Sequence, residues 1–116
     1  MSKNNVDVAV AYYTAMGEKD VSSMEKYLHP DVRFSAPLDK MTGKEAVLEA
    51  VKQFAPFYKT LKIRAQFGSE DQAVIVYDFD FPAPIGNFPS AALLTFQDGL
   101  IAQIELFYDA RAFEKK

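Results

Sequence analysis

The fold is decided by the stretch SAALLTFQDGLIAQIELFY at residues 90–108. Two runs rich in β-forming residues flank Asp98-Gly99, a dipeptide typical of the two-residue turn of a β-hairpin. Such a turn fixes which residues face each other, because a slip of one position would turn every side chain to the other face. The sequence therefore predicts a hairpin of two antiparallel strands at this end of the chain.

The expected register gives this hairpin one apolar face and one more polar face. The predicted cross-strand pairs are Phe96 with Ile101, Leu93 with Ile104, and Ala91 with Leu106. Seven residues are then expected on the core face: Ala91, Leu93, Thr95, Ala102, Ile104, Leu106 and Tyr108. Glu105 is expected on the opposite face.

Two more strands are predicted before the hairpin. Residues 61–67 alternate between apolar and polar side chains, as a half-buried strand does. Residues 72–81 alternate as well, with Ile75, Tyr77, Phe79 and Phe81 on one face. The other face carries Val74, Val76, Asp78 and Asp80. The first face is the more apolar, which favours it as the core face.

The first half of the chain has helical patterns. Residues 5–18 predict a helix that buries Ala9, Tyr12, Tyr13 and Met16. Asp20 is a good N-cap for a short second helix, which must end before Pro30. A short strand is expected at 31–36. The sequence at 42–45, Thr-Gly-Lys-Glu, predicts a capping box that opens a third helix ending near Pro56.

The predicted order is therefore α-α-β-α-β-β-β-β, which indicates an α+β domain. Helices in this order must bury their apolar stripes on one side of a mostly antiparallel sheet. A strongly bent sheet wrapped on three helical segments would leave a cavity, the usual place for a ligand. The chain has 116 residues and a mass of 13.0 kDa, so residues 1–116 are expected to form a single domain.

Composition excludes several classes of protein. The absence of cysteine removes disulfides and thiolate chemistry, and a net charge of −3 argues against a nucleic-acid partner. The sequence lacks a signal-peptide pattern and any apolar run long enough to cross a membrane. A soluble, cytoplasmic protein is expected, with neither a nucleic-acid nor a membrane partner.

Several segments resemble the nuclear transport factor 2-like superfamily, and within it the SnoaL-like and ketosteroid-isomerase-like group. They are Ala11-Tyr12-Tyr13, Asp20 at the start of the second helix, the stretches at 27–32 and 42–47, the hairpin at 96–101 and the stretch at 106–111. The resemblance covers nearly the whole chain. It implies a cone-shaped α+β fold with a persistent hydrophobic cavity.

The resemblance implies only part of the ketosteroid isomerase site. That site needs a carboxylate base and an oxyanion hole made by a tyrosine and a neutral aspartic acid. Tyr12 matches the tyrosine, but the base falls at Ala36 and the aspartic acid at Ala91 or Ala92. Alanine cannot transfer a proton, so the isomerase mechanism is not expected here.

Asp78 is the carboxylate candidate for a cyclase-like site. The resemblance favours Asp78 inside the cavity, where apolar surroundings would raise its pKa, whereas the hydrophobic pattern favours it outside. With Asp78 inside, Tyr12 would stabilise negative charge on a substrate oxygen and Asp78 would move the proton. Tyr12 could equally be a packing residue of the first helix.

An apolar ligand wall is the other expected part of the site. Five residues are its candidates: Phe34, Phe54, Ile104, Leu106 and Tyr108. The same residues could instead form a filled core. His29 is the sole histidine, so no metal site is expected. No cofactor is expected either, because a buried carboxylate and a phenol can run enolisation alone.

Two functions remain open. One is a small-molecule-binding SnoaL-like protein that acts as a cofactor-independent isomerase, cyclase or hydrolase on an apolar metabolite. The other is a non-catalytic homodimer that binds a ligand or a protein. A dimer would be supported by exposed apolar residues on the outer sheet face, for which Phe96, Ile101 and Phe107 are the candidates.

Overall fold

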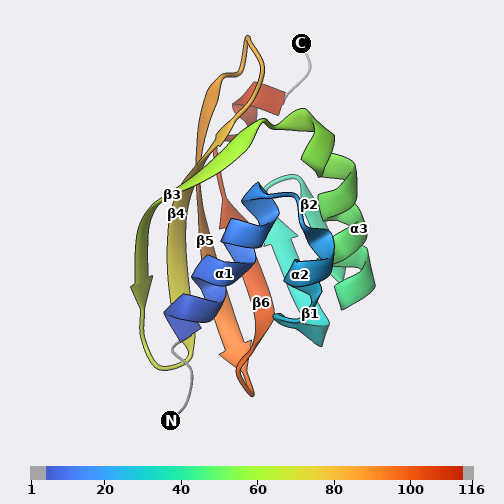
Figure 1. Ribbon diagram of the computed structural model, residues 1–116, viewed down its shortest axis with the longest axis vertical. Coiled ribbons are helices and arrows are strands. Elements are labelled where there is room, and N and C mark those ends of the chain that lie inside the picture. Colours follow the sequence, from blue (N-terminus) through green and yellow to red (C-terminus); the bar gives the residue numbers. More distant parts are fainter. Residues whose placement is uncertain (1–4, 114–116) are drawn as a thin grey trace.

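Six strands and three α-helices make up residues 5–113, the part of the chain that this computed structural model describes (Figure 1). The α-helices are α1 (Asn5–Gly17), α2 (Val21–Glu25) and α3 (Lys44–Phe54), and the 3-10 helices are η1 (Ala55–Phe57) and η2 (Ala110–Phe113). The strands are β1 (Leu28–Ala36), β2 (Asp39–Thr42), β3 (Thr60–Gly68), β4 (Gln72–Asp80), β5 (Asn87–Gln97) and β6 (Leu100–Phe107).

The strands form one curved sheet in the order β2-β1-β6-β5-β4-β3. Neighbouring strands are antiparallel except β1 and β6, which are parallel. Figure 1 shows α1 lying across the sheet, with α2 and α3 beside it on the same side. The predicted α+β cone is confirmed, and each of its three helical segments is present.

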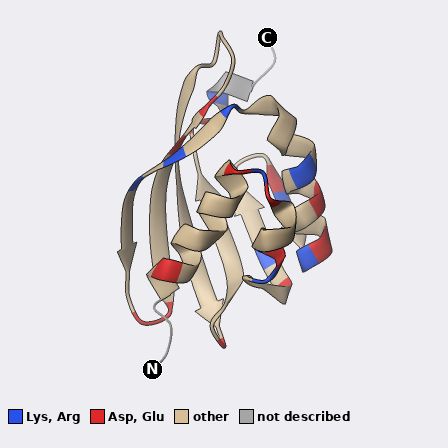
Figure 2. Ribbon diagram, in the orientation of Figure 1, with Lys and Arg blue, Asp and Glu red and all other residues tan. Residues whose placement is uncertain are grey.

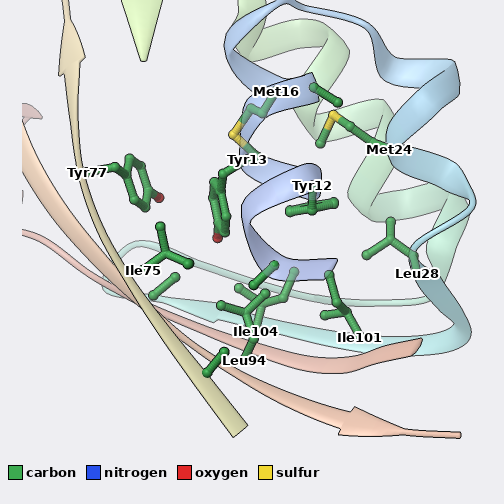
Figure 3. Packing of buried hydrophobic residues seen from close by; sticks show 14 of the residues in the cluster. Tyr12, Tyr13, Met16, Met24, Leu28, Ile75, Tyr77, Leu94, Ile101 and Ile104 are labelled. Atoms are coloured by element: carbon green, nitrogen blue, oxygen red, sulfur yellow. The ribbon is translucent and has the colours of Figure 1, made fainter. Parts of the chain in front are cut away.

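Helix α1 buries the stripe that its sequence predicts. Ala9, Tyr12, Tyr13 and Met16 are all 9% exposed or less. They pack against the inner face of the sheet, as Figure 3 shows for Tyr13 beside Tyr77. These contacts hold the first helix over the central strands.

The start of α2 is capped as predicted. The Asp20 carboxylate accepts hydrogen bonds from the Ser23 backbone N–H at 3.2 Å and from the Ser23 hydroxyl at 2.7 Å. These bonds favour the charged carboxylate and lower the pKa of Asp20. The chain then enters β1 at Leu28, three residues earlier than expected. The register between β1 and β6 shifts between Leu28 and Arg33, and this irregularity accommodates Pro30 within the strand.

The structure before and at the start of α3 differs from the sequence prediction in two ways. Residues 39–42 form strand β2, which the sequence pattern did not reveal, so Thr42 ends a strand and no capping box forms. Gly43 is the N-cap instead, with φ +104° and ψ 143°, a conformation in which a Cβ would be strained. Glycine therefore makes the sharp change from strand to helix possible.

The hairpin is present, but half of its register differs from the prediction. Asp98 and Gly99 have φ values of 56° and 79°, as a two-residue turn of type I′ requires. Phe96 faces Ile101 as expected. Strand β6 then carries one extra residue, Ala102, opposite the step from Thr95 to Phe96, and this bulge shifts the pairing by one residue, which the turn alone could not reveal.

The bulge changes which residues of β5 reach the core. Leu94 and Ala92, rather than Leu93 and Ala91, face Ile104 and Leu106. The buried residues of β5 are therefore Phe88, Ser90, Ala92, Leu94 and Phe96. The predicted core positions Ala91, Leu93 and Thr95 lie on the other face and are only half-buried.

Candidate functional site

A cavity of about 240 Å³ remains between the inner face of the sheet and the helices α1 and α3. Its described lining is mostly apolar and comes from α1, α3 and every strand of the sheet except β3. The lining residues are Tyr12, Tyr13, Met16, Phe34, Ala36, Asp39, Met41, Val47, Ala50, Val51, Phe54, Tyr77, Phe79, Phe88, Ser90, Ile104, Leu106 and Tyr108. An engineered cavity of about 150 Å³ admits benzene, so this space is large enough for a molecule with one or two rings.

The five residues predicted as an apolar wall all line this cavity. Phe34 comes from β1, Phe54 from α3, Ile104 and Leu106 from β6, and Tyr108 follows β6 directly. The strand residues among them lie on the inward face of their strands. These side chains surround open space rather than a completely filled core.

Tyr12 brings a phenol to the cavity from α1. Its side chain is 1% exposed, and its hydroxyl makes no hydrogen bond within the part of the chain that the structure describes. The neighbouring Tyr58, by contrast, donates its hydroxyl to the Met16 carbonyl at 2.5 Å. Burial, with smaller contributions from Tyr13 and Tyr58, raises the pKa of Tyr12 well above its ordinary value. Tyr12 is therefore a neutral hydrogen-bond donor near neutral pH.

Asp78 lies on the sheet face turned away from the cavity. The buried face of β4 carries Ile75, Tyr77 and Phe79, as the hydrophobic pattern favoured. Asp78 instead pairs with Arg64 of β3 at 3.4 Å, in a solvent-accessible position where such a pair contributes little stability. The expectation that Asp78 faces the cavity is therefore wrong, because the aromatic face of β4 is the one that packs under α1.

Two polar residues of the cavity were not predicted from the sequence. Ser90 is 6% exposed and comes from β5, while Asp39 comes from β2 and is the sole carboxylate among the described lining residues. Asp39 pairs across the β1–β2 turn with Ala36, the position where the resemblance places a base. The signal that could have located Asp39 is the short connection Pro37-Leu38 between two strands.

Tyr108 and Asp39 together form a polar region of the cavity wall. Burial raises the pKa of Tyr108, and the Asp39 charge raises it further. The Asp39 carboxylate also accepts the Lys40 backbone N–H at 2.9 Å. This region can accept a hydrogen bond from a ligand or donate one to it.

The described residues contain neither a metal-binding cluster nor a membrane-spanning helix. Within residues 5–113, no group of three or more histidine, cysteine, aspartate or glutamate side chains could hold a metal ion. None of the described helices is long and apolar enough to cross a membrane. The described cavity wall thus offers phenols, one hydroxyl and one carboxylate as its chemical groups.

The fold is shared by many solved structures. A protein from Kribbella flavida DSM 17836 is 25% identical with a TM-score of 0.86, covering 93% of this chain and 88% of that one. An NTF2-like protein of unknown function from Cytophaga hutchinsonii ATCC 33406 is 16% identical with a TM-score of 0.83, covering 98% of both chains. TerC, co-crystallised with polyporic acid, is 18% identical with a TM-score of 0.79, covering 94% of both.

Sequence comparison gives the family directly. No curated protein sequence matches the chain significantly. The model of the SnoaL-like domain family matches residues 9–104, which include most of α1, most of the sheet and nearly every residue that lines the cavity. The chain belongs to the SnoaL-like domain family, within the NTF2-like fold.

Proposed function

We propose that this protein binds a small, mostly apolar molecule of one or two rings in the cavity between α1, α3 and the sheet. The observation that supports this proposal most strongly is the cavity itself, which stays open although five aromatic and aliphatic wall residues surround it. TerC, a neighbour in fold, was co-crystallised with polyporic acid, which supports this use of the fold. Phe34, Phe54, Ile104, Leu106 and Tyr108 would contact the apolar part of the ligand.

Tyr12 would orient the ligand through an oxygen. Tyr12 has no hydrogen-bond partner among the described residues, and in a low-dielectric cavity its hydroxyl is best satisfied by donating a hydrogen bond to a carbonyl or phenolic oxygen of the ligand. An enzyme that uses Tyr12 with Asp78 needs that carboxylate in the cavity, and Asp78 lies outside it. The geometry therefore gives no support to a reaction that pairs Tyr12 with Asp78.

A thermal-shift titration with neutral one- and two-ring ketones and phenols tests this function. A compound at about 100 times its dissociation constant should stabilise the fold by roughly 2.7 kcal/mol. 1-Indanone, 2-tetralone and 2-naphthol are suitable probes, because each combines a ring system with one oxygen. Absence of stabilisation by every compound of this size would contradict the proposal.

Replacing Tyr12 by phenylalanine should weaken ketone binding by about 5- to 10-fold, the value of one hydrogen bond. The stability of the protein should change little, because the hydroxyl has no partner among the described residues. Naphthalene, which has no oxygen, is the control ligand and should bind the wild type and Tyr12→Phe equally. Calorimetric titration measures both constants, and an equal loss for naphthalene would show that Tyr12 acts only by packing.

A homodimer is a second proposal, and the outer sheet face supports it. Along neighbouring strands this face presents a continuous apolar surface: Ala65, Phe67, Val74, Val76, Ala91, Leu93 and Phe107. Phe67 and Phe107 are 62% and 53% exposed. Figure 2 shows β5, in the middle of this face, without a charged residue. A second copy would cover this surface symmetrically.

The residues first expected to support a dimer must be corrected. Phe96 and Ile101 are 7% and 0% exposed, because the bulge in β6 places Ile101 on the same inner face as Ile104, and Phe96 faces Ile101. Of the three candidates, only Phe107 is available to a partner.

Phe107→Asp should convert a dimer into a monomer in sedimentation velocity, because it places a charge within the apolar surface. Phe57→Asp is the matched control, since Phe57 is 64% exposed but lies in η1, outside the sheet. A monomeric wild type, or dissociation caused by Phe57→Asp alone, would contradict the proposed interface.

A further inference from the structure

The described cavity wall contains one charged side chain, and its charge is negative. Among the described residues that line it there is no lysine, arginine or histidine, and Asp39 is the one ionisable carboxylate. The remaining polar groups are the tyrosine hydroxyls and Ser90. An anionic ligand placed in this cavity would find no basic side chain in the described wall to neutralise it.

Strand β2 explains why Asp39 reaches the cavity and its basic neighbour does not. Successive side chains of a strand point to opposite faces, so Asp39 and Met41 share the face that lines the cavity. Lys40 lies between them and belongs to the other face. On β1, Phe34 and Ala36 continue the same inner surface.

Asp39 lies where the cavity meets solvent. This residue is exposed, whereas Tyr12 at another part of the wall is 1% exposed. The Asp39 charge is close enough to Tyr108 to influence the ionisation of that phenol. A carboxylate and a phenol therefore stand together at the outer end of an otherwise apolar space.

We propose that Asp39 makes the cavity selective for ligands that are uncharged or cationic and that carry a hydrogen-bond donor, such as a hydroxyl or an amine, at their solvent-facing end. The inference rests on the proposed binding function and adds the charge and the orientation of the ligand. The ring system would lie against the apolar wall, and the donor would meet the Asp39 carboxylate. Carboxylates and phosphates would be rejected by the same charge.

Three probes of nearly equal size test this selectivity: 2-naphthol, 2-(aminomethyl)naphthalene and 2-naphthoate. At neutral pH the first is uncharged, the second a cation and the third an anion. Calorimetric titration of the full chain at low salt should show the amine binding about tenfold or more tightly than the carboxylate, as expected for one nearby charge in a partly solvated site. High salt should reduce this preference, because exposed charges are screened.

Two variants separate selectivity from general binding. Asp39→Asn keeps the shape of the side chain and should bring the amine and the carboxylate to within about threefold of each other. Binding of 2-naphthol should weaken by no more than about tenfold, because the amide oxygen of asparagine can still accept its hydroxyl. Asp31→Asn removes another exposed carboxylate, one that does not line the cavity, and should leave the wild-type preference intact.

The outcomes distinguish this inference from the proposed function. Equal binding of amine and carboxylate to the wild type, or an unchanged ratio in Asp39→Asn, would overturn the role of Asp39 while 2-naphthol binding upheld the cavity. Failure of all three probes to bind would overturn both proposals together.

Discussion

Above about pH 10 the protein should lose stability steeply, and it should be unfolded by about pH 13. Tyr12, Tyr13 and Tyr77 are each 1–2% exposed, and burial raises the pKa of all three above their ordinary value. Phenols of the unfolded chain ionise near pH 10, whereas those of the folded protein stay neutral. Their stabilising effect is therefore complete below pH 10 and is lost as the pH rises towards the folded-state pKa values.

The expected loss of stability per pH unit is large. Each phenol held neutral costs about 1.4 kcal/mol of stability per pH unit above pH 10, so three together cost about 4 kcal/mol per unit. Over about three units the loss is about 12 kcal/mol, which equals or exceeds the stability of most domains, since typical values are about 5–15 kcal/mol.

One pH titration can follow both tyrosine ionisation and unfolding. Ultraviolet absorbance reports tyrosinate, and far-ultraviolet circular dichroism reports the helices. The chain has six tyrosines and no tryptophan, so the absorbance reports phenols without interference. The last ionisations should coincide with loss of the helical signal. Ionisation of all six tyrosines while the helices persist would show that water enters the aromatic core freely, contrary to a dry apolar cavity.

Filling the cavity should abolish ligand binding without unfolding the protein. Ala50 lies on the inner side of α3 and lines the cavity, so Ala50→Phe would place a ring in the space that the ligand needs. We expect affinity to fall at least about 100-fold, equivalent to about 2.7 kcal/mol. Stability should change by less than about 1.5 kcal/mol, because the new ring enters existing space.

The same helix supplies the control. Ala46 is exposed, one turn earlier on α3, and Ala46→Phe adds the same ring outside the cavity. This variant should bind 2-naphthol with the wild-type affinity. Denaturant unfolding checks the stability of both variants. If Ala50→Phe bound as tightly as Ala46→Phe, the ligand would have to bind elsewhere.

Much of the fold could be predicted because its signals are local. The turn at Asp98-Gly99, the cap at Asp20 and the alternation in residues 72–81 each depend on neighbours in the chain. The bulge at Ala102 was not predicted, because a register counted from the turn assumes an uninterrupted pairing of the two strands. Its sign in the sequence is the three-residue spacing of Ile101 and Ile104, which are both buried. Strand β2 was missed because its four residues are too few and too polar for a periodic signal.

The candidate site was predictable only where it is apolar. Phe34, Ile104 and Leu106 follow from strand periodicity, which marks the inward face. The cavity carboxylate could not be predicted from strand periodicity, because Asp39 reaches the cavity through the pairing of two strands across a turn. The resemblance pointed to Asp78, which the packing of the β4 aromatic residues places on the opposite face.

Methyl NMR during a titration with 2-naphthol tests most directly whether the cavity is the binding site. The methyl signals of Ile104 and Val51, which line the cavity, should shift and saturate at one ligand per chain, while those of Val74 and Leu93 on the outer sheet face stay in place. Saturating shifts at Val74 and Leu93, with Ile104 and Val51 unchanged, would contradict binding in the cavity.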